Sequence, residues 1–187
     1  MAKHTGKIRF TARLLQPAQP KNATWSFIVL PKTASAKLPT RSMVSVDGTM
    51  DGVPFQATLQ PDGDSSHWLK VERTLLEAAN AEVGASVELE VAPVAEEPEP
   101  TLPADLRKAL TAHPDALATW QDITPVARRD WIHWITSGKK AETRVKRIDV
   151  ACAKLACGQR RACCFGRSGT YSKGNIGAPL ARHLHRA

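Results

Sequence analysis

Two hydrophobic patterns divide the chain near residue 93. Before it, apolar and polar residues alternate in short runs, which is the pattern of strands with one buried face. From residue 102 onward, apolar residues recur every three or four positions, as in amphipathic helices. The change of period predicts an α+β protein in which a β domain precedes a helical module.

The first part of the chain predicts about six short strands with turn signals between them. Its clearest passage is residues 43–59, where two alternating runs are separated by Asp47-Gly48 and Asp51-Gly52. Asp-Gly pairs supply the positive φ that tight hairpin turns need. Residues 31–40 are expected to form a polar loop, and residues 73–84 one short helix. Closure into a small β-barrel or sandwich leaves few exposed edges, so we expect residues 1–93 to form one.

A Pro/Glu-rich stretch, residues 94–101, predicts an extended linker whose glutamates stay solvated. The helical module is expected over residues 102–158, with helix starts marked by Pro103, Pro114 and Thr124-Pro125. In its last helix, one buried face is expected to contain Val145, Ile148, Cys152 and Leu155. Residues 159–187 are Gly-rich, basic and without periodicity, which predicts a flexible tail.

Composition limits the location of the protein. Hydrophobic residues make up 42% of the 187 residues, enough for a core, but no run approaches the roughly 18 apolar residues of a membrane span. The basic N-terminus is not followed by an apolar segment of the kind that signal peptides carry. We therefore expect a cytoplasmic protein without a transmembrane segment.

The charge is unevenly distributed between the two parts. Residues 1–100 carry a net charge of −2 and residues 101–187 one of +10. A strongly basic half suggests an anionic partner: nucleic acid, an acidic protein or a lipid headgroup. The alternative is a basic face that is merely solvated or paired within the chain. The candidate anion-binding residues are Arg128, Arg129, Arg144, Arg147, Arg160, Arg161 and Arg167.

All four cysteines, Cys152, Cys157, Cys163 and Cys164, fall within 13 residues. Structural zinc sites use two closely spaced ligand pairs, which the spacing C-x₄-C-x₅-C-C does not provide, so we expect no metal site. Cys152 is interpreted as a core residue. The other three are redox candidates, since neighbouring arginines favour the reactive thiolate.

Particular stretches of the second half carry a resemblance to a known family. The entry "LPADLRKAL", the passage "DITPVARRDWIHWITSGKKAETRVKRI" and the later "CCFGRSG" resemble the YdeI/OmpD-associated family in order and spacing. The stretches "TWSFIVLP", "VSVDGTMDGVPFQATL" and "VGASVELEV" are similar to a small β-barrel domain of unknown function that often precedes it. The resemblance implies a bacterial protein with a role in envelope stress or in bacteriocin or antimicrobial-peptide resistance. It implies no reaction and no cofactor.

The sequence contains no G-x-S-x-G, Walker or H-E-x-x-H motif. We therefore expect a non-enzymatic binding protein without a cofactor. Two alternatives stay open, namely a nucleic-acid-binding protein that uses the basic C-terminal half and a thiol or metal sensor that uses the C-terminal cysteines. A homodimer through the β-barrel is one option for its assembly.

Overall fold

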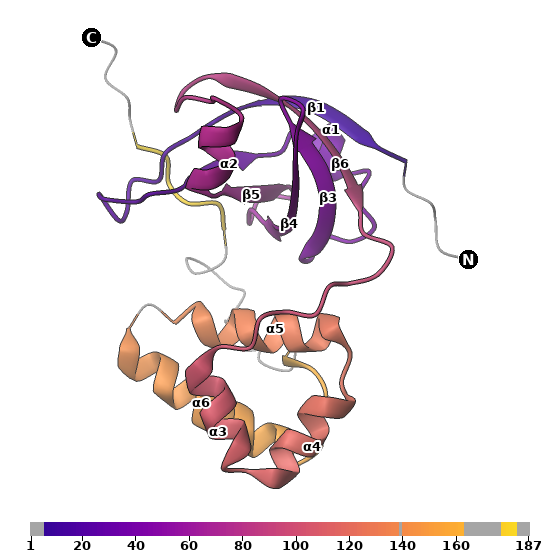
Figure 1. Ribbon diagram of the computed structural model, residues 1–187, viewed down its shortest axis with the longest axis vertical. Helices are drawn as coiled ribbons and strands as arrows, with labels where there is room; N and C mark the ends of the chain where they lie inside the picture. The colour runs from indigo at the N-terminus through magenta and orange to yellow at the C-terminus, as the bar shows by residue number, and fades with distance from the viewer. Residues whose placement is uncertain (1–5, 139, 163–176, 183–187) are drawn as a thin grey trace. The chain divides into compact units, whose positions relative to one another are not determined.

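The computed structural model describes residues 6–138, 140–162 and 177–182 (Figure 1). They form two compact units. The first unit, here called the β unit, contains the residues up to Ala95 together with residues 177–182. The second, the helical unit, starts at Glu96. The predicted α+β class is confirmed.

The β unit is built on a curved antiparallel sheet of six strands, a half-barrel. Its strands are β1 (Ile8–Arg13), β2 (Ser26–Val29), β3 (Val44–Met50), β4 (Val53–Pro61), β5 (His67–Val71) and β6 (Ser86–Pro93). They lie in the order β1-β6-β3-β4-β5-β2. Beyond β1, Leu15 forms an antiparallel bridge with Phe27 of β2, so the two edges of the sheet approach each other. This closure shields edges that would otherwise be open to pairing with another chain.

Only one of the two Asp-Gly pairs forms a turn. Asp51 and Gly52 have φ values of 48° and 84° and join β3 to β4. Gly48 lies inside β3, opposite Phe55, and a Cβ there would overlap the carbonyl oxygen of Glu90. Gly48 is therefore required by the close approach of β6 and not by a turn.

Two short helices accompany the sheet, α1 (Lys32–Ser35) and α2 (Arg73–Ala78). The first lies in a stretch that was expected to be a loop. A single helical turn is too short to show a periodic pattern in the sequence. Ala34 and Ser35 are buried in it. The second ends six residues before the expected end at Gly84, since Asn80 adopts a positive φ.

The helical unit contains α3 (Ala104–Thr111), α4 (Pro114–Asp122), α5 (Pro125–Thr136) and α6 (Ala141–Ala156). Thr124 caps α5 as expected, with its side-chain oxygen accepting a hydrogen bond from the Ala127 amide. Trp131 is fully buried in the core of this unit. On α6, Ile148, Cys152 and Leu155 are buried as predicted. Val145 is 59% exposed, because it lies at the margin of the apolar stripe near the start of the helix.

Candidate functional site

Three of the candidate arginines bind the C-terminal ends of helices, and two of them do so at the end of α4. Arg128 donates from Nε to the carbonyl oxygen of Trp120 at 3.0 Å and from Nη2 to that of Gln121 at 2.8 Å. Arg160 donates to the carbonyl oxygen of Asp122 at 2.9 Å and also pairs with its carboxylate. Carbonyls in the last turn of a helix lack intrahelical donors, so these two arginines complete the C-terminus of α4.

Arg147 performs the same task at the end of α5. Its Nη1 donates to the carbonyl oxygen of Trp134 and, at 2.8 Å, to Oγ of Ser137. The guanidinium also lies over the Trp134 ring, 5.2 Å from its centroid. Arg147 is thereby held by two hydrogen bonds and a cation–π contact inside the helical unit.

Arg144 links two helices that are distant in sequence. It forms a bidentate pair with Asp105, with distances of 2.5 Å from Nε to Oδ2 and 3.0 Å from Nη2 to Oδ1. Asp105 lies in the first turn of α3, where the helix dipole also favours a carboxylate. The hydrogen bonds from Arg144 hold the pKa of Asp105 below its ordinary value. The pair fixes α6 against the start of α3.

The acidic linker binds both arginines of α5. Glu99 accepts from Nη1 of Arg128 at 2.8 Å, and Glu97 accepts from Nη1 of Arg129 at 2.5 Å. The side chain of Glu97 is only 14% exposed. The expectation that these glutamates stay solvated is wrong for Glu97, because a basic helix face lies within its reach.

Two titratable residues of α5, Asp130 and His133, interact with Arg129 and have shifted pKa values. Burial raises the pKa of Asp130, although Arg129 partly offsets this. Burial also lowers the pKa of His133, with the charge of Asp130 acting in the opposite direction. Shifted pairs of this kind occur at functional sites and in structural networks alike. Burial is the main cause of both pKa shifts, so the shifts reflect the packing of α5.

The other candidate residues have simpler environments. Arg161 is exposed, and among the described residues its side chain makes no hydrogen bond or ion pair. Cys157 is exposed just after α6, whereas Cys152 is buried and its thiol pKa is raised by that burial. Arg167, Cys163 and Cys164 lie outside the described residues. Within the described part of the chain, no group of three His, Cys, Asp or Glu side chains is arranged to hold a metal ion.

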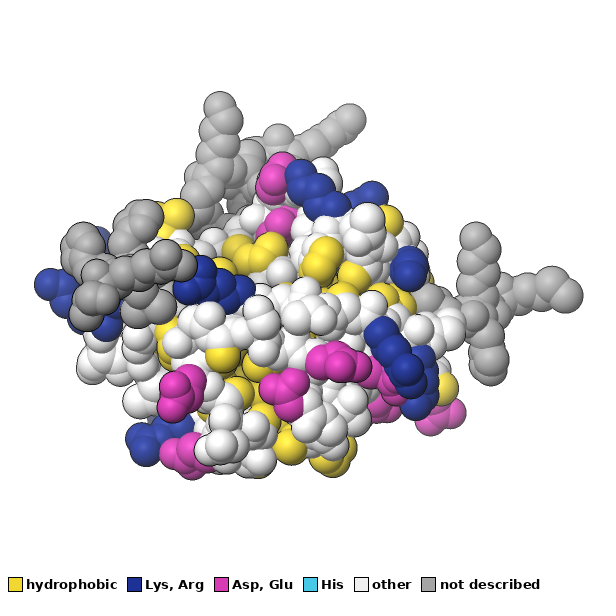
Figure 2. Space-filling model, turned by 90° about the horizontal axis from the view of Figure 1, so that it is seen from above, with side chains coloured by type: hydrophobic (Ala, Val, Ile, Leu, Met, Phe, Trp, Pro, Cys, Tyr) yellow, Lys and Arg dark blue, Asp and Glu magenta, His cyan; other side chains and the backbone are white. Residues whose placement is uncertain are grey.

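The six candidate arginines that the structure describes therefore do not form one open basic surface. Five of the seven have hydrogen-bonded partners inside the helical unit at 2.5–3.0 Å. Figure 2 shows a face of the β unit, where lysine and arginine side chains likewise stand in separate groups, with acidic and apolar side chains between them. The structure brings Arg128 and Arg129 together on the linker and distributes the others over different helix ends.

A serine–histidine pair lies inside the β unit. Oγ of Ser35 in α1 is 2.7 Å from Nδ1 of His67 in β5, and Nε2 of His67 is 2.9 Å from the carbonyl oxygen of Ser42. Both side chains are buried, with exposed fractions of 1% for Ser35 and 0% for His67. A nucleophile and its base need access to substrate, which this burial denies. The pair joins α1 and the following loop to the sheet.

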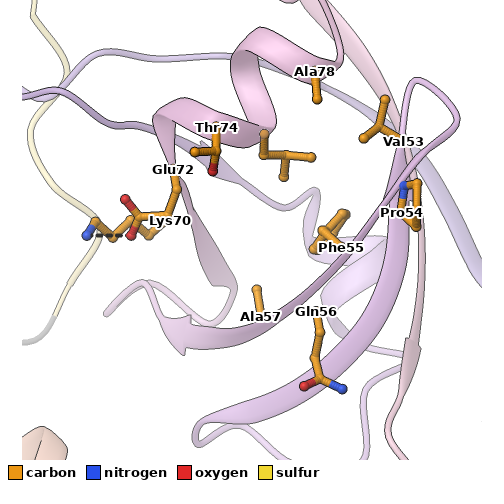
Figure 3. Close-up of a pocket in the computed structure, with 10 residues that line it drawn as sticks. Val53, Pro54, Phe55, Gln56, Ala57, Lys70, Glu72, Thr74 and Ala78 are labelled. Atoms are coloured by element: carbon orange, nitrogen blue, oxygen red, sulfur yellow. Dashed lines mark ion pairs between the residues drawn. The ribbon is translucent and has the colours of Figure 1, made fainter. Parts of the chain in front are cut away.

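The β unit has a groove between α2 and strands β4 and β5 (Figure 3). Its volume is about 320 Å³. Apolar side chains from the strand and the helix line it: Val53, Pro54, Phe55, Ala57, Leu75 and Ala78. Phe55 and Ala57 point toward α2, while Gln56 points away from it (Figure 3). The groove exists because α2 covers the apolar face of β4 only in part.

Charged groups stand at one side of this groove. Nζ of Lys70 is 2.7 Å from Oε1 of Glu72, and it also lies 5.3 Å from the centroid of the Trp25 ring. Thr74 adds a hydroxyl beside them. The arrangement suits a ligand with an apolar part and a charged part. Sequence reasoning missed this site, although the alternation of Phe55, Ala57 and Leu59 did predict an apolar strand face.

Comparisons with known proteins agree with the two-part architecture. A family model described as bacteriocin-protection, YdeI or OmpD-associated matches residues 99–158. A model for a domain of unknown function, DUF1905, matches residues 10–91. A search of curated proteins found no match. The chain therefore joins a DUF1905 domain to a module of the bacteriocin-protection, YdeI or OmpD-associated family.

Proposed function

We propose that this chain is a non-enzymatic, cytoplasmic binding protein that takes up amphipathic peptides and thereby protects the cell against bacteriocins or similar antimicrobial peptides. The observation that carries the proposal is the groove between α2 and β4, with its apolar walls and the Lys70–Glu72 pair beside it. The family description supports the biological context, since it refers to bacteriocin protection.

The groove suits one or two large apolar side chains of a peptide. Its volume of about 320 Å³ lies at the lower end of the range for ligand sites, which bind mainly through apolar contact and a few polar groups. A cationic group on the same peptide would find Glu72, whose side chain is 61% exposed. Lys70 would retain its contact with the Trp25 ring while Glu72 exchanged partners.

Nucleic-acid binding has less support from the helical unit. The arginines that motivated it donate to Glu97, Glu99, Asp105 and helix-end carbonyls, and a phosphate would have to displace these acceptors. Displacing them would leave the helix-end carbonyls without hydrogen-bond donors and would separate the ion pairs. A polyanion site on these residues would therefore compete with the stability of the fold.

The test is a titration of the full chain with a fluorescein-labelled cationic peptide of alternating leucine and lysine segments, followed by fluorescence anisotropy. Ala78→Trp fills the groove from an exposed position on α2. Because it excludes a side chain worth about 1.5–3 kcal/mol of burial, affinity is expected to fall roughly tenfold to hundredfold. Glu77→Trp is the matched control on the same helix, since Glu77 does not line the groove.

The proposal requires binding that Ala78→Trp weakens and Glu77→Trp leaves unchanged within about twofold. Glu72→Gln should weaken the peptide less and reduce the salt dependence of its binding, because one exposed ion pair is lost. Absence of saturable binding to the wild type, or equal binding by the two tryptophan variants, would exclude the groove as the site.

A further inference from the structure

The end of the described chain returns to the β unit after the helical unit. Residues 177–182, the yellow segment of Figure 1, run antiparallel to residues 16–18. The Ala18 amide donates to the Leu180 carbonyl at 2.7 Å, and the Arg182 amide donates to the Gln16 carbonyl at 2.8 Å. A third bond joins the Ala178 amide to the Asp62 carbonyl at 3.1 Å. We call residues 177–182 the strap.

The positions of the prolines match this pairing. Pro17 of the sheet edge is opposite Ala181, at a position where the ladder requires no amide donor. Pro179 of the strap lies between the donor at residue 178 and the acceptor at residue 180. Proline is tolerated at a sheet edge only where its missing N–H is not needed. Both segments therefore have sequences compatible with this one register.

The strap is held through its backbone more than through its side chains. The side chain of Leu180 is 83% exposed. At Gly177, a Cβ would lie 3.0 Å from the Asp62 carbonyl oxygen, so the close approach favours glycine. One side-chain hydrogen bond also holds the strap, in which Nη2 of Arg182 donates to the Lys21 carbonyl at 2.7 Å. Recognition of this kind is that of strand addition, in which backbone bonds give affinity.

We propose that residues 16–18, together with the Asp62 and Lys21 carbonyls, form a docking edge for an extended peptide, and that the strap covers this edge in cis. The partner is a peptide segment with a small residue, a proline and an arginine at the spacing of Gly177, Pro179 and Arg182. The strap lies outside both family matches, which end at residues 91 and 158. The edge is distinct from the groove, so it does not depend on the proposed function.

The strap is suited to exchange. It has few partners, and its backbone bonds lie at the surface with an exposed leucine among them, features of segments that open locally at little cost. A peptide in solution competes with a tethered segment whose effective concentration is on the order of millimolar. The full chain should therefore resist the peptide, and a chain without the strap should accept it.

The experiment uses the chain ending at residue 176 and a labelled synthetic peptide with the sequence of residues 177–187. We expect saturable binding below about 1 mM, and binding to the full chain at least about tenfold weaker. A peptide with Ala178→Pro lacks the donor to Asp62 and should bind more weakly, whereas Leu180→Ser should bind as the parent peptide does. Circular dichroism establishes that the shortened chain is folded.

A second variant keeps the whole chain. Ala178→Pro in the full chain removes the same donor and should let the peptide bind more tightly than it binds the wild type. The proposal is overturned if the folded shortened chain shows no saturable binding up to about 1 mM, if the full chain binds equally well, or if Ala178→Pro changes nothing.

Discussion

Replacing Arg128 by alanine should destabilise the helical unit much more than replacing Arg161. Arg128 is 19% exposed and donates to the carbonyls of Trp120 and Gln121, which lie in the last turn of α4. Hydrogen bonds from a charged donor contribute about 1.5–3 kcal/mol each, and the partly exposed pair with Glu99 adds less than about 1 kcal/mol. Because both bonds come from one guanidinium, their energies do not add in full, and we expect Arg128→Ala to cost about 2–4 kcal/mol of local stability.

Amide hydrogen exchange of the full chain, resolved by mass spectrometry, measures this loss where it occurs. If exchange follows the opening equilibrium, amides of α4 and α5 should exchange roughly 30- to 700-fold faster in Arg128→Ala. Arg128→Lys should give an intermediate result, because an ammonium group cannot reproduce the fork that reaches two carbonyls and Glu99.

Arg161→Ala is the matched control, because it removes the same charge from an exposed residue. Its effect on exchange in α4 and α5 should correspond to less than about 0.5 kcal/mol. Unchanged exchange in Arg128→Ala, or equal acceleration by both alanine variants, would contradict a stabilising role for the hydrogen bonds of Arg128. The second outcome would mean that net charge, and not the hydrogen bonds, decides stability.

Three further changes test other contacts. Gly48→Ala should cost about 1–3 kcal/mol in thermal unfolding, because the added Cβ meets the Glu90 carbonyl; wild-type stability would refute that contact. His67→Ala should cost about 3 kcal/mol in urea unfolding, since it leaves a cavity and the buried Ser35 hydroxyl without its partner; a loss below about 1 kcal/mol would contradict this. In Asp105→Asn, the midpoint of unfolding should fall less steeply as the pH is lowered into the acid range. Arg144 lowers the pKa of Asp105 below 3.8, so stability present above that value is lost as the pH falls through the lowered pKa. An equally steep fall in the acid range would rule out this pair as its source.

Alternation and turn chemistry predicted much of the β unit. The positive φ at Asp51-Gly52 was foreseen, because a two-residue hairpin requires it. Gly48 was misread as a second turn signal, since glycine serves equally where two strands approach closely. Helix α1 escaped prediction because one turn stabilised by burial of Ser35 has no periodic signature. The longer helices were predicted well because many apolar residues in each of them recur at the helical period and mark the same buried face.

The candidate site was harder to predict than the fold. Charge counting found the arginines but could not tell a free guanidinium from a paired one. Their partners, such as Glu97, Asp105 and the carbonyl of Asp122, lie 32 to 39 residues away in sequence. The groove depends on how far α2 covers β4, which is a tertiary property. The strap binds through backbone groups, which every residue has, so Gly and Arg content alone suggested a flexible tail.

The most direct test of the account is a ¹H–¹⁵N spectrum of the full chain titrated with the leucine–lysine peptide. Peptide binding in the groove should cause chemical-shift changes confined to β4, β5 and α2, centred on Phe55, Lys70 and Ala78, and should leave the arginine amides of α5 and α6 unmoved. Shifts concentrated on Arg128, Arg129 and Arg144 would contradict binding in the groove, because they would place the binding surface on residues assigned here to holding the helical unit together.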